Sequence, residues 1–180
     1  MKNKNNIIDN IFESSSTVIL NSKNLSDSII TCIALISKAI KNGNKIIIFG
    51  NGGSAADAQH MAAEFVGRFM KERKSFPAIA LTTDSSIITA IGNDYGFEKI
   101  FSRQLESLLK KGDVILAIST SGKSENVING IKTSKKLGSK IILLTGEKNF
   151  KMGKLSDVIL NVPSTTTPRI QEAHRTIIHI

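Results

Sequence analysis

Short, continuous apolar runs recur along the chain, and small or polar residues follow each one. Runs of this length are typical of strands that are buried on both faces of a parallel sheet. The segments between the runs space their apolar residues as helices do. The runs lie at residues 45–50, 78–83, 114–118 and 141–145, with a weaker fifth at 158–162.

The alternation of strands and helices predicts right-handed crossovers and a parallel α/β sheet. Thr167 is expected to cap the last helix, with Pro168 at its first position. Ligands bind at the carboxyl ends of such strands, so the loops that follow the strands are the candidates for a site. An N-terminal helical segment is expected at about 1–42. Further helices are expected at 54–69, 86–91, 97–110, 124–137 and 167–180.

Length and composition narrow the class of protein. The chain has 180 residues, 41% of them hydrophobic and 22% charged, which predicts one folded domain over 1–180. Cys32 is the only cysteine, and no apolar run approaches the roughly 18 residues of a membrane span, so we expect neither a disulfide nor a membrane partner. The polar start lacks the apolar stretch of a signal peptide, which favours a cytoplasmic protein.

A formal net charge of +9 raises the question of nucleic-acid binding. The lysines are scattered along the chain, however, and aromatic residues do not alternate with them. The favoured interpretation is a solvated surface combined with an anionic substrate, and no nucleic-acid partner is expected.

Residues 119–124, Ser-Thr-Ser-Gly-Lys-Ser, follow a predicted strand and open a helix. Hydroxyl groups, free backbone N–H groups and the positive end of a helix dipole together favour a phosphate monoester. The spacing is not that of a Walker A loop. An ordinary capped turn is the alternative, and the density of hydroxyl residues favours the anion site.

Two other loops carry weaker signals. In the glycine-rich stretch 50–54 the backbone can approach a ligand closely, but the dinucleotide-binding spacing Gly-x-Gly-x-x-Gly is absent, and a tight turn is the alternative. Asn93 and Asp94 fall in a predicted loop rich in turn formers, where an Asx turn and a contact to sugar hydroxyls are equally compatible with the residues.

His60 and Glu64 are four residues apart, on one face of a predicted helix. They could share a metal or bracket a substrate, whereas a surface hydrogen-bonded pair is the simpler explanation. The neighbouring alanines predict a largely buried helix, in which an ionised Glu64 without a function is unfavourable. On the last helix, Gln171, Arg175 and His179 form a polar stripe that a solvated face would also explain.

Taken together, these pieces resemble the sedoheptulose-7-phosphate isomerases of the SIS (sugar isomerase) fold. They span nearly the whole chain in order, which makes the resemblance specific although each motif alone is weak. The matching stretches are residues 50–64, 81–84, 90–97, 118–124 and 169–174, with His179.

The resemblance implies a three-layer αβα, flavodoxin-like domain and a homotetramer with active sites near subunit interfaces. It implies conversion of D-sedoheptulose 7-phosphate to D-glycero-D-manno-heptose 7-phosphate, which leads to the heptose of lipopolysaccharide. Glu64 would be the base and His179 its acid/base partner. One zinc ion per subunit would lie on His60, Glu64, Gln171 and His179. The implied substrate contacts are Asn51, Gly52, Gly53, Glu64, Asn93, Asp94, Ser119, Thr120, Ser121, Ser124 and Gln171.

The chemistry agrees with these residue types, because an enediol route needs a base and a proton carrier. A carboxylate held tightly on zinc is a poorer base, so the two implied roles of Glu64 compete. The chain also departs from the family at 164–168, Ser-Thr-Thr-Thr-Pro, where an acidic residue is usual. Two alternatives stay open: a non-catalytic SIS-fold binding module of the replication-initiator-binding type, and an isomerase for another sugar phosphate.

Overall fold

Five parallel strands form the centre of the computed structural model, which describes residues 2–148 and 150–180, with side chains for 6–148 and 151–180. The strand order is β2-β1-β3-β4-β5. This arrangement confirms the predicted parallel α/β sheet. The strands are β1 (Ile46–Gly50), β2 (Ala78–Ala80), β3 (Val114–Ser119), β4 (Lys140–Thr145) and β5 (Val158–Asn161).

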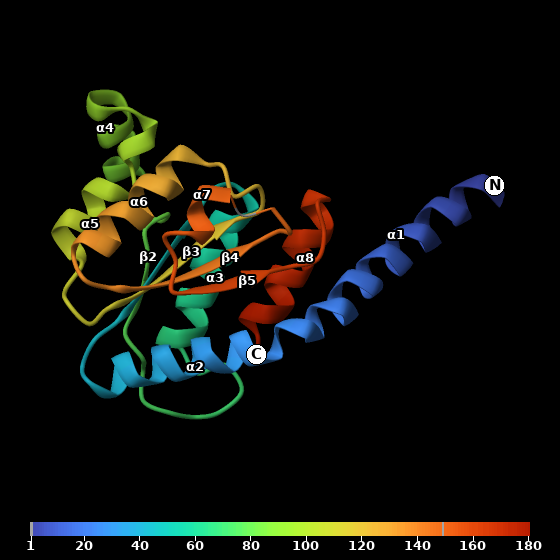
Figure 1. The fold of residues 1–180 in the computed structure, drawn as a ribbon, viewed down its shortest axis with the longest axis horizontal. Helices are drawn as coiled ribbons and strands as arrows, with labels where there is room; N and C mark the ends of the chain where they lie inside the picture. The colour runs from blue at the N-terminus through green and yellow to red at the C-terminus, as the bar shows by residue number, and fades with distance from the viewer. Residues whose placement is uncertain (1, 149) are drawn as a thin grey trace.

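Helices cover both faces of the sheet, as Figure 1 shows, so the fold has the three predicted αβα layers. Most crossovers run through one of these helices, while the first two helices precede the sheet. The helices are α1 (Lys2–Asn21), η1 (Ser22–Leu25), α2 (Ser26–Lys41), α3 (Gly53–Val66), α4 (Ser85–Tyr95), η2 (Phe97–Lys99), α5 (Ser102–Leu108), α6 (Glu125–Lys136), α7 (Phe150–Gly153) and α8 (Thr167–Ile178).

Two hydrophobic cores lie on opposite faces of the sheet because successive strand side chains point to opposite sides. Ile46 and Ile48 of β1 face one core, where α2, α3 and α8 pack. Ile47 and Phe49 face the other, where α5 and α6 pack. Both faces of β1 are therefore buried, which explains why its sequence reads as an unbroken apolar run.

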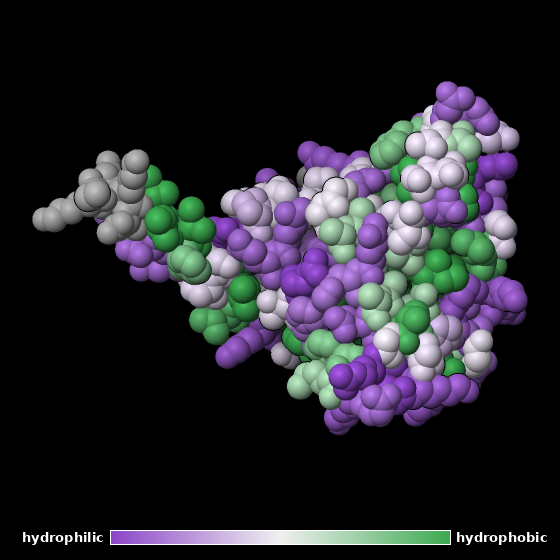
Figure 2. Space-filling model, turned by 180° about the vertical axis from the view of Figure 1, so that it is seen from behind, coloured by the Kyte–Doolittle hydropathy of each residue, from purple (hydrophilic) through white to green (hydrophobic). Residues whose placement is uncertain are grey.

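The N-terminal helix α1 leads away from the body of the molecule (Figure 1). The middle of α1 contacts α8, because Nη1 of Arg169 donates a hydrogen bond to the carbonyl oxygen of Ile11 at 3.2 Å. Figure 2 shows apolar side chains along this projecting arm, and Ile7, Ile8, Ile11 and Phe12 are all exposed. Among the described residues, no helix is long and apolar enough to cross a bilayer.

Several boundaries differ from the sequence prediction, among them the end of α3, which lies at Val66 and not at 69. Asn93 and Asp94 lie in the last turn of α4, not in a loop, because the helix continues through Gly92 and ends at Gly96, whose φ is +92°. Strand β2 is shorter than 78–83, since it is an edge strand that pairs with β1 alone. The segment 97–110 divides into η2 and α5. The cap residue of α8 is Thr166, one residue earlier than expected.

Candidate active site

The site lies where the strand order reverses direction, between β1 and β3. Crossovers on either side of this point leave in opposite directions, and the loops that follow the two strands border a crevice. A reciprocal amide pair connects the loop after β1 to the first turn of α6, which follows the loop after β3: Asn51 Nδ2 donates to Asn126 Oδ1 and Asn126 Nδ2 donates to Asn51 Oδ1, both at 2.9 Å. Asn126 is only 3% exposed, so the pair fixes the spacing of the two loops.

The loop of residues 119–124, called the phosphate loop below, follows β3 and leads into α6. Its turn is held by the Ser119 hydroxyl, which accepts from the Gly122 N–H at 3.2 Å and lies 3.5 Å from the Ser124 hydroxyl. Gly122 takes a φ of +64°, a left-handed conformation that favours glycine. Ser124 occupies the N-cap of α6 without capping it through its side chain. The first turn of a 12-residue helix thus points toward these hydroxyl groups, an arrangement suited to an anion.

The glycine loop after β1 packs directly against α8. Gly52, at the N-cap of α3, has a φ of +55°, and Gly53 begins the helix. A Cβ atom at Gly53 would stand 2.2 Å from Nε2 of Gln171, so any larger residue here would force the end of the Gln171 side chain to move. The contact sets Gln171 at the start of α3, beside the loop predicted to hold the sugar.

Three of the four predicted metal ligands meet further along α3. The Nε2 atoms of His60 and His179 are 2.7 Å apart, and Nε2 of His60 is 3.6 Å from Oε1 of Glu64. The donor atoms of all three side chains lie within 4.8 Å of one another, close enough to hold a metal ion. The fourth, Gln171, lies eight residues before His179, about 12 Å along the helix axis, and its side chain packs on Gly53.

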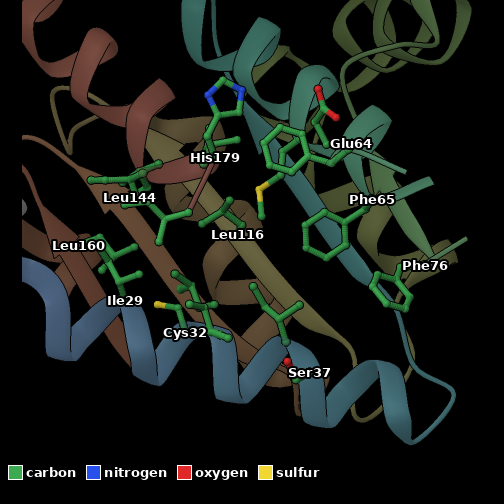
Figure 3. Close-up of a pocket in the computed structure, with 18 of the residues that line it drawn as sticks. Ile29, Cys32, Ser37, Glu64, Phe65, Phe76, Leu116, Leu144, Leu160 and His179 are labelled. Atoms are coloured by element: carbon green, nitrogen blue, oxygen red, sulfur yellow. The ribbon is translucent and has the colours of Figure 1, made fainter. Parts of the chain in front are cut away.

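Glu64 stands at the edge of a mainly apolar cavity of about 280 Å³ (Figure 3). His179 lies at the same edge, and apolar side chains from α2, α3 and the sheet line the rest. The Glu64 side chain is 31% exposed and Ala63 is exposed as well, so this face of α3 is less buried than the alanine pattern predicted. Glu64 therefore has apolar walls on one side and access to solvent on the other.

An ion pair that the sequence analysis missed joins α3 to α8. Oδ1 of Asp57 lies 2.6 Å from Nη2 of Arg175, and the Asp57 side chain is only 5% exposed. Burial raises the pKa of Asp57, and the Arg175 guanidinium partly offsets this rise. Asp57 is three residues before His60, and Arg175 is four residues before His179, so the pair lies next to the metal-ligand cluster. The stripe at 171, 175 and 179 is the only sequence signal for it.

Asn93 and Asp94 stand apart from these groups. Both are exposed on α4, which Figure 1 shows on the opposite side of the molecule from α8, and Asn93 Nδ2 donates to Asp94 Oδ1 at 2.8 Å. The chain thus gathers the phosphate loop, the glycine loop and Gln171 at the carboxyl edge of the sheet, and His60, Glu64 and His179 further along α3.

Comparison with known proteins shows the family to which the chain belongs. A family model described as the SIS domain matches residues 12–146, which defines the class of protein. The chain is 52% identical over 174 residues to the phosphoheptose isomerase of Aquifex aeolicus, covering 96% of this chain and 91% of that protein.

Two solved phosphoheptose isomerase structures share the fold closely. The one from Neisseria gonorrhoeae has a TM-score of 0.92 and 41% identity, covering 97% of this chain and 94% of its own. The one from Francisella tularensis has a TM-score of 0.94 and 36% identity, covering 98% and 94%. The chain belongs to the phosphoheptose isomerase family, which confirms the family, the fold and the class of aldose–ketose isomerase predicted from the sequence.

Proposed function

We propose that the chain interconverts D-sedoheptulose 7-phosphate and D-glycero-D-manno-heptose 7-phosphate through an enediol. One observation carries this proposal. His60 and Glu64 lie on α3, the helix that begins at the glycine loop, and they meet His179, which lies 119 residues after His60 in the sequence. A carboxylate beside two imidazoles is a suitable set for moving protons near neutral pH. The relatives named phosphoheptose isomerase support the choice of substrate.

The substrate would lie along the N-terminal half of α3. Its phosphate would accept hydrogen bonds from Ser119, Thr120, Ser121 and Ser124, and the first turn of α6 would stabilise the charge. From Gly53 to His60 the helix rises by about 10 Å, which suits an extended seven-carbon chain. The glycine loop and Gln171 would contact the sugar between its phosphate and its reacting carbons.

Proton transfer would then fall to Glu64 and His179. Glu64 would remove the proton from the carbon next to the carbonyl and return it to the neighbouring carbon, so that ketose becomes aldose. His179 would move the proton between the two oxygens, since an imidazole can both donate and accept near neutral pH. The apolar cavity behind Glu64 would limit the access of water from that side.

The donor set of the cluster fits a divalent metal such as zinc. Two imidazole nitrogens and a carboxylate oxygen within 4.8 Å are typical zinc ligands. We propose that His60, Glu64 and His179 hold one zinc ion per subunit. Family resemblance implies Gln171 as the fourth ligand, and its side chain, which packs on Gly53, would have to turn toward the cluster to reach the metal. When bound, the metal would supply polarisation of the sugar oxygens. Glu64 would have to leave the metal to act as a free base.

The assembly and setting follow from the same resemblance. We propose a single SIS domain over 1–180, a homotetramer, a cytoplasmic location, and a role in supplying heptose for lipopolysaccharide. The exposed apolar side chains of α1 suit burial against other subunits. Asn93 and Asp94 are exposed on α4, away from α8, and would contact the sugar at a site near a subunit interface.

Turnover in deuterated water with a panel of phosphorylated ketoses tests the proposal. We expect conversion of sedoheptulose 7-phosphate in preference to ketoses with shorter chains, and solvent deuterium on the product carbon. Conversion without deuterium would point to a hydride shift instead of an enediol. Preference for another ketose would reassign the substrate, and binding without turnover would favour a binding module.

A further inference from the structure

A strained residue lies in the turn that follows α3, three residues beyond the end of the helix. Phe69 has a φ of +49°, and among the described residues it is the only non-glycine residue with a positive φ. A bulky side chain rarely adopts this conformation, and it persists only where the surrounding structure enforces it. Strain of this kind often marks a functional position, so the contacts of Phe69 are informative.

Arg73 enforces the turn that contains Phe69. Its guanidinium group donates from Nη2 to the carbonyl of Glu64 at 2.7 Å, and from Nη1 to the carbonyls of Phe65 at 2.9 Å and Gly67 at 3.3 Å. The last carbonyls of a helix lack partners within the helix, and a cation there also complements the helix dipole. Arg73 further stacks on Phe76, with 4.1 Å between its Cζ and the ring centroid. Arg73 thus connects the end of α3, before the turn, to Phe76, after it.

The Phe69 side chain, which lies in this turn, stacks on the His179 ring. The Phe69 and His179 rings are nearly parallel, at 7°, with centroids 5.6 Å apart. The His179 ring also meets the His60 ring edge-on, at 78°. His179 lies just beyond the last residue of α8 and is exposed, so its own helix does little to restrict the ring. The stack with Phe69 and the 2.7 Å contact to Nε2 of His60 are what restrict it.

We propose that Phe69 is a positioning residue that holds the His179 imidazole in the orientation needed for proton transfer. The inference rests on the proposed function of His179 in this site. Phe69 does not touch the reacting atoms; it acts through the imidazole. The positive φ of Phe69 places its ring against His179, and the hydrogen bonds of Arg73 maintain this backbone conformation.

Phe69→Gly separates this role from a structural one. Glycine adopts a φ of +49° without strain, so the turn should form at least as easily, while the ring is lost. Met70→Gly is the matched control, because Met70 is the next residue and is 81% exposed. Phe69→Tyr keeps the ring, and Phe69→Asn is a second variant that tolerates a positive φ.

For each variant, kcat and KM for sedoheptulose 7-phosphate, the thermal unfolding midpoint and the NMR shifts of the His179 ring protons are measured. We expect Phe69→Gly and Phe69→Asn to lower kcat about 10- to 100-fold, as misplaced catalytic groups do. KM and the unfolding midpoint should match those of Met70→Gly, and the His179 protons should lose the shielding of the stacked ring. Phe69→Tyr should behave as the wild type does.

An unchanged kcat in Phe69→Gly would overturn the proposal. So would a parallel loss of kcat and of the unfolding midpoint in both ring-free variants, because Phe69 would then be a packing residue. A wild-type protein that does not isomerise the heptulose phosphate would instead reject the proposed function. In that case an unshifted His179 resonance in Phe69→Gly would still reject the positioning role of Phe69.

Discussion

The phosphate loop and the His60–Glu64–His179 cluster are built in opposite ways. The loop consists of six consecutive residues, and its turn is held by its own hydroxyl and N–H groups. The cluster joins two helices across 119 residues of sequence, and its side chains are half-buried or exposed. The loop needs only a strand that leads into a helix, whereas the cluster needs α8 to pack against α3 in one register.

Because of this difference, we expect the phosphate loop to act in substrate binding and the cluster to act in proton transfer. A preformed loop can hold a phosphate whether or not α8 is correctly placed. The proposed proton transfer would fail if α8 shifted, because His179 would move with that helix. The ion pair between the buried Asp57 and the more exposed Arg175, together with the contact between Gly53 and Gln171, holds the two helices together. Changes in the loop should therefore affect KM, and changes in the cluster should affect kcat.

Glu64→Gln is expected to have the largest effect. The amide keeps the shape of the side chain but cannot remove a proton, so kcat should fall by about 10²–10⁴ while KM changes little. Steady-state kinetics with sedoheptulose 7-phosphate measure both constants. His179→Gln should act in the same direction.

Metal analysis is the control for this variant. Protein purified without a metal-affinity tag should carry zinc in the wild type, and His60→Ala should lose it. Substantial turnover by Glu64→Gln at wild-type zinc content would show that another residue is the base, with Asp94 of a neighbouring subunit the next candidate. A metal-free wild type with full activity would remove zinc from the proposal.

Ser119→Ala and Ser124→Ala test the other side of the comparison. Each removes a hydroxyl from the phosphate loop, and a lost charge-assisted hydrogen bond costs about 1–3 kcal/mol. KM should rise by roughly 5- to 150-fold with kcat nearly unchanged, as measured by the same kinetics. Equal losses of kcat and kcat/KM would mean that the loop acts in the transition state as well. Unchanged constants in both variants would place the phosphate elsewhere.

A smaller effect concerns the pH dependence of stability. His174 of α8 is fully buried, and within the described structure neither ring nitrogen makes a hydrogen bond of ordinary geometry. Burial lowers its pKa to about 4, and the nearby Thr145 backbone opposes this only in part. Above a pH of about 6.5 the ring is neutral in both the folded and the unfolded chain. As the pH falls from there toward 4, only the unfolded chain gains the proton, so the folded state loses stability.

At pH 5 this loss should amount to about 2 kcal/mol relative to pH 8. Urea unfolding at both pH values measures it, and His174→Leu is the comparison, because groups common to both proteins cancel. The leucine variant should lose less stability on acidification by that amount. The same pH dependence in both proteins would show that His174 is protonated in the folded state.

Much of this protein can be predicted from local patterns. Strands β1, β3 and β4 agree with the predicted apolar runs to within about one residue, since strands buried on both faces leave an unbroken signal. The phosphate loop is equally evident because its chemistry lies in consecutive residues. The family motifs were sufficient to name the enzyme class.

Helix ends and distant contacts required the tertiary structure. Gly92 suggested a loop, but a glycine costs a helix only about 1 kcal/mol, and α4 continues to the left-handed Gly96. The pairing of Asp57 with Arg175 and the stacking of Phe69 on His179 have no local signature, because each joins residues far apart in the sequence. Periodicity reports which face of a helix is buried, whereas the packing of α8 on α3 decides which side chains meet there.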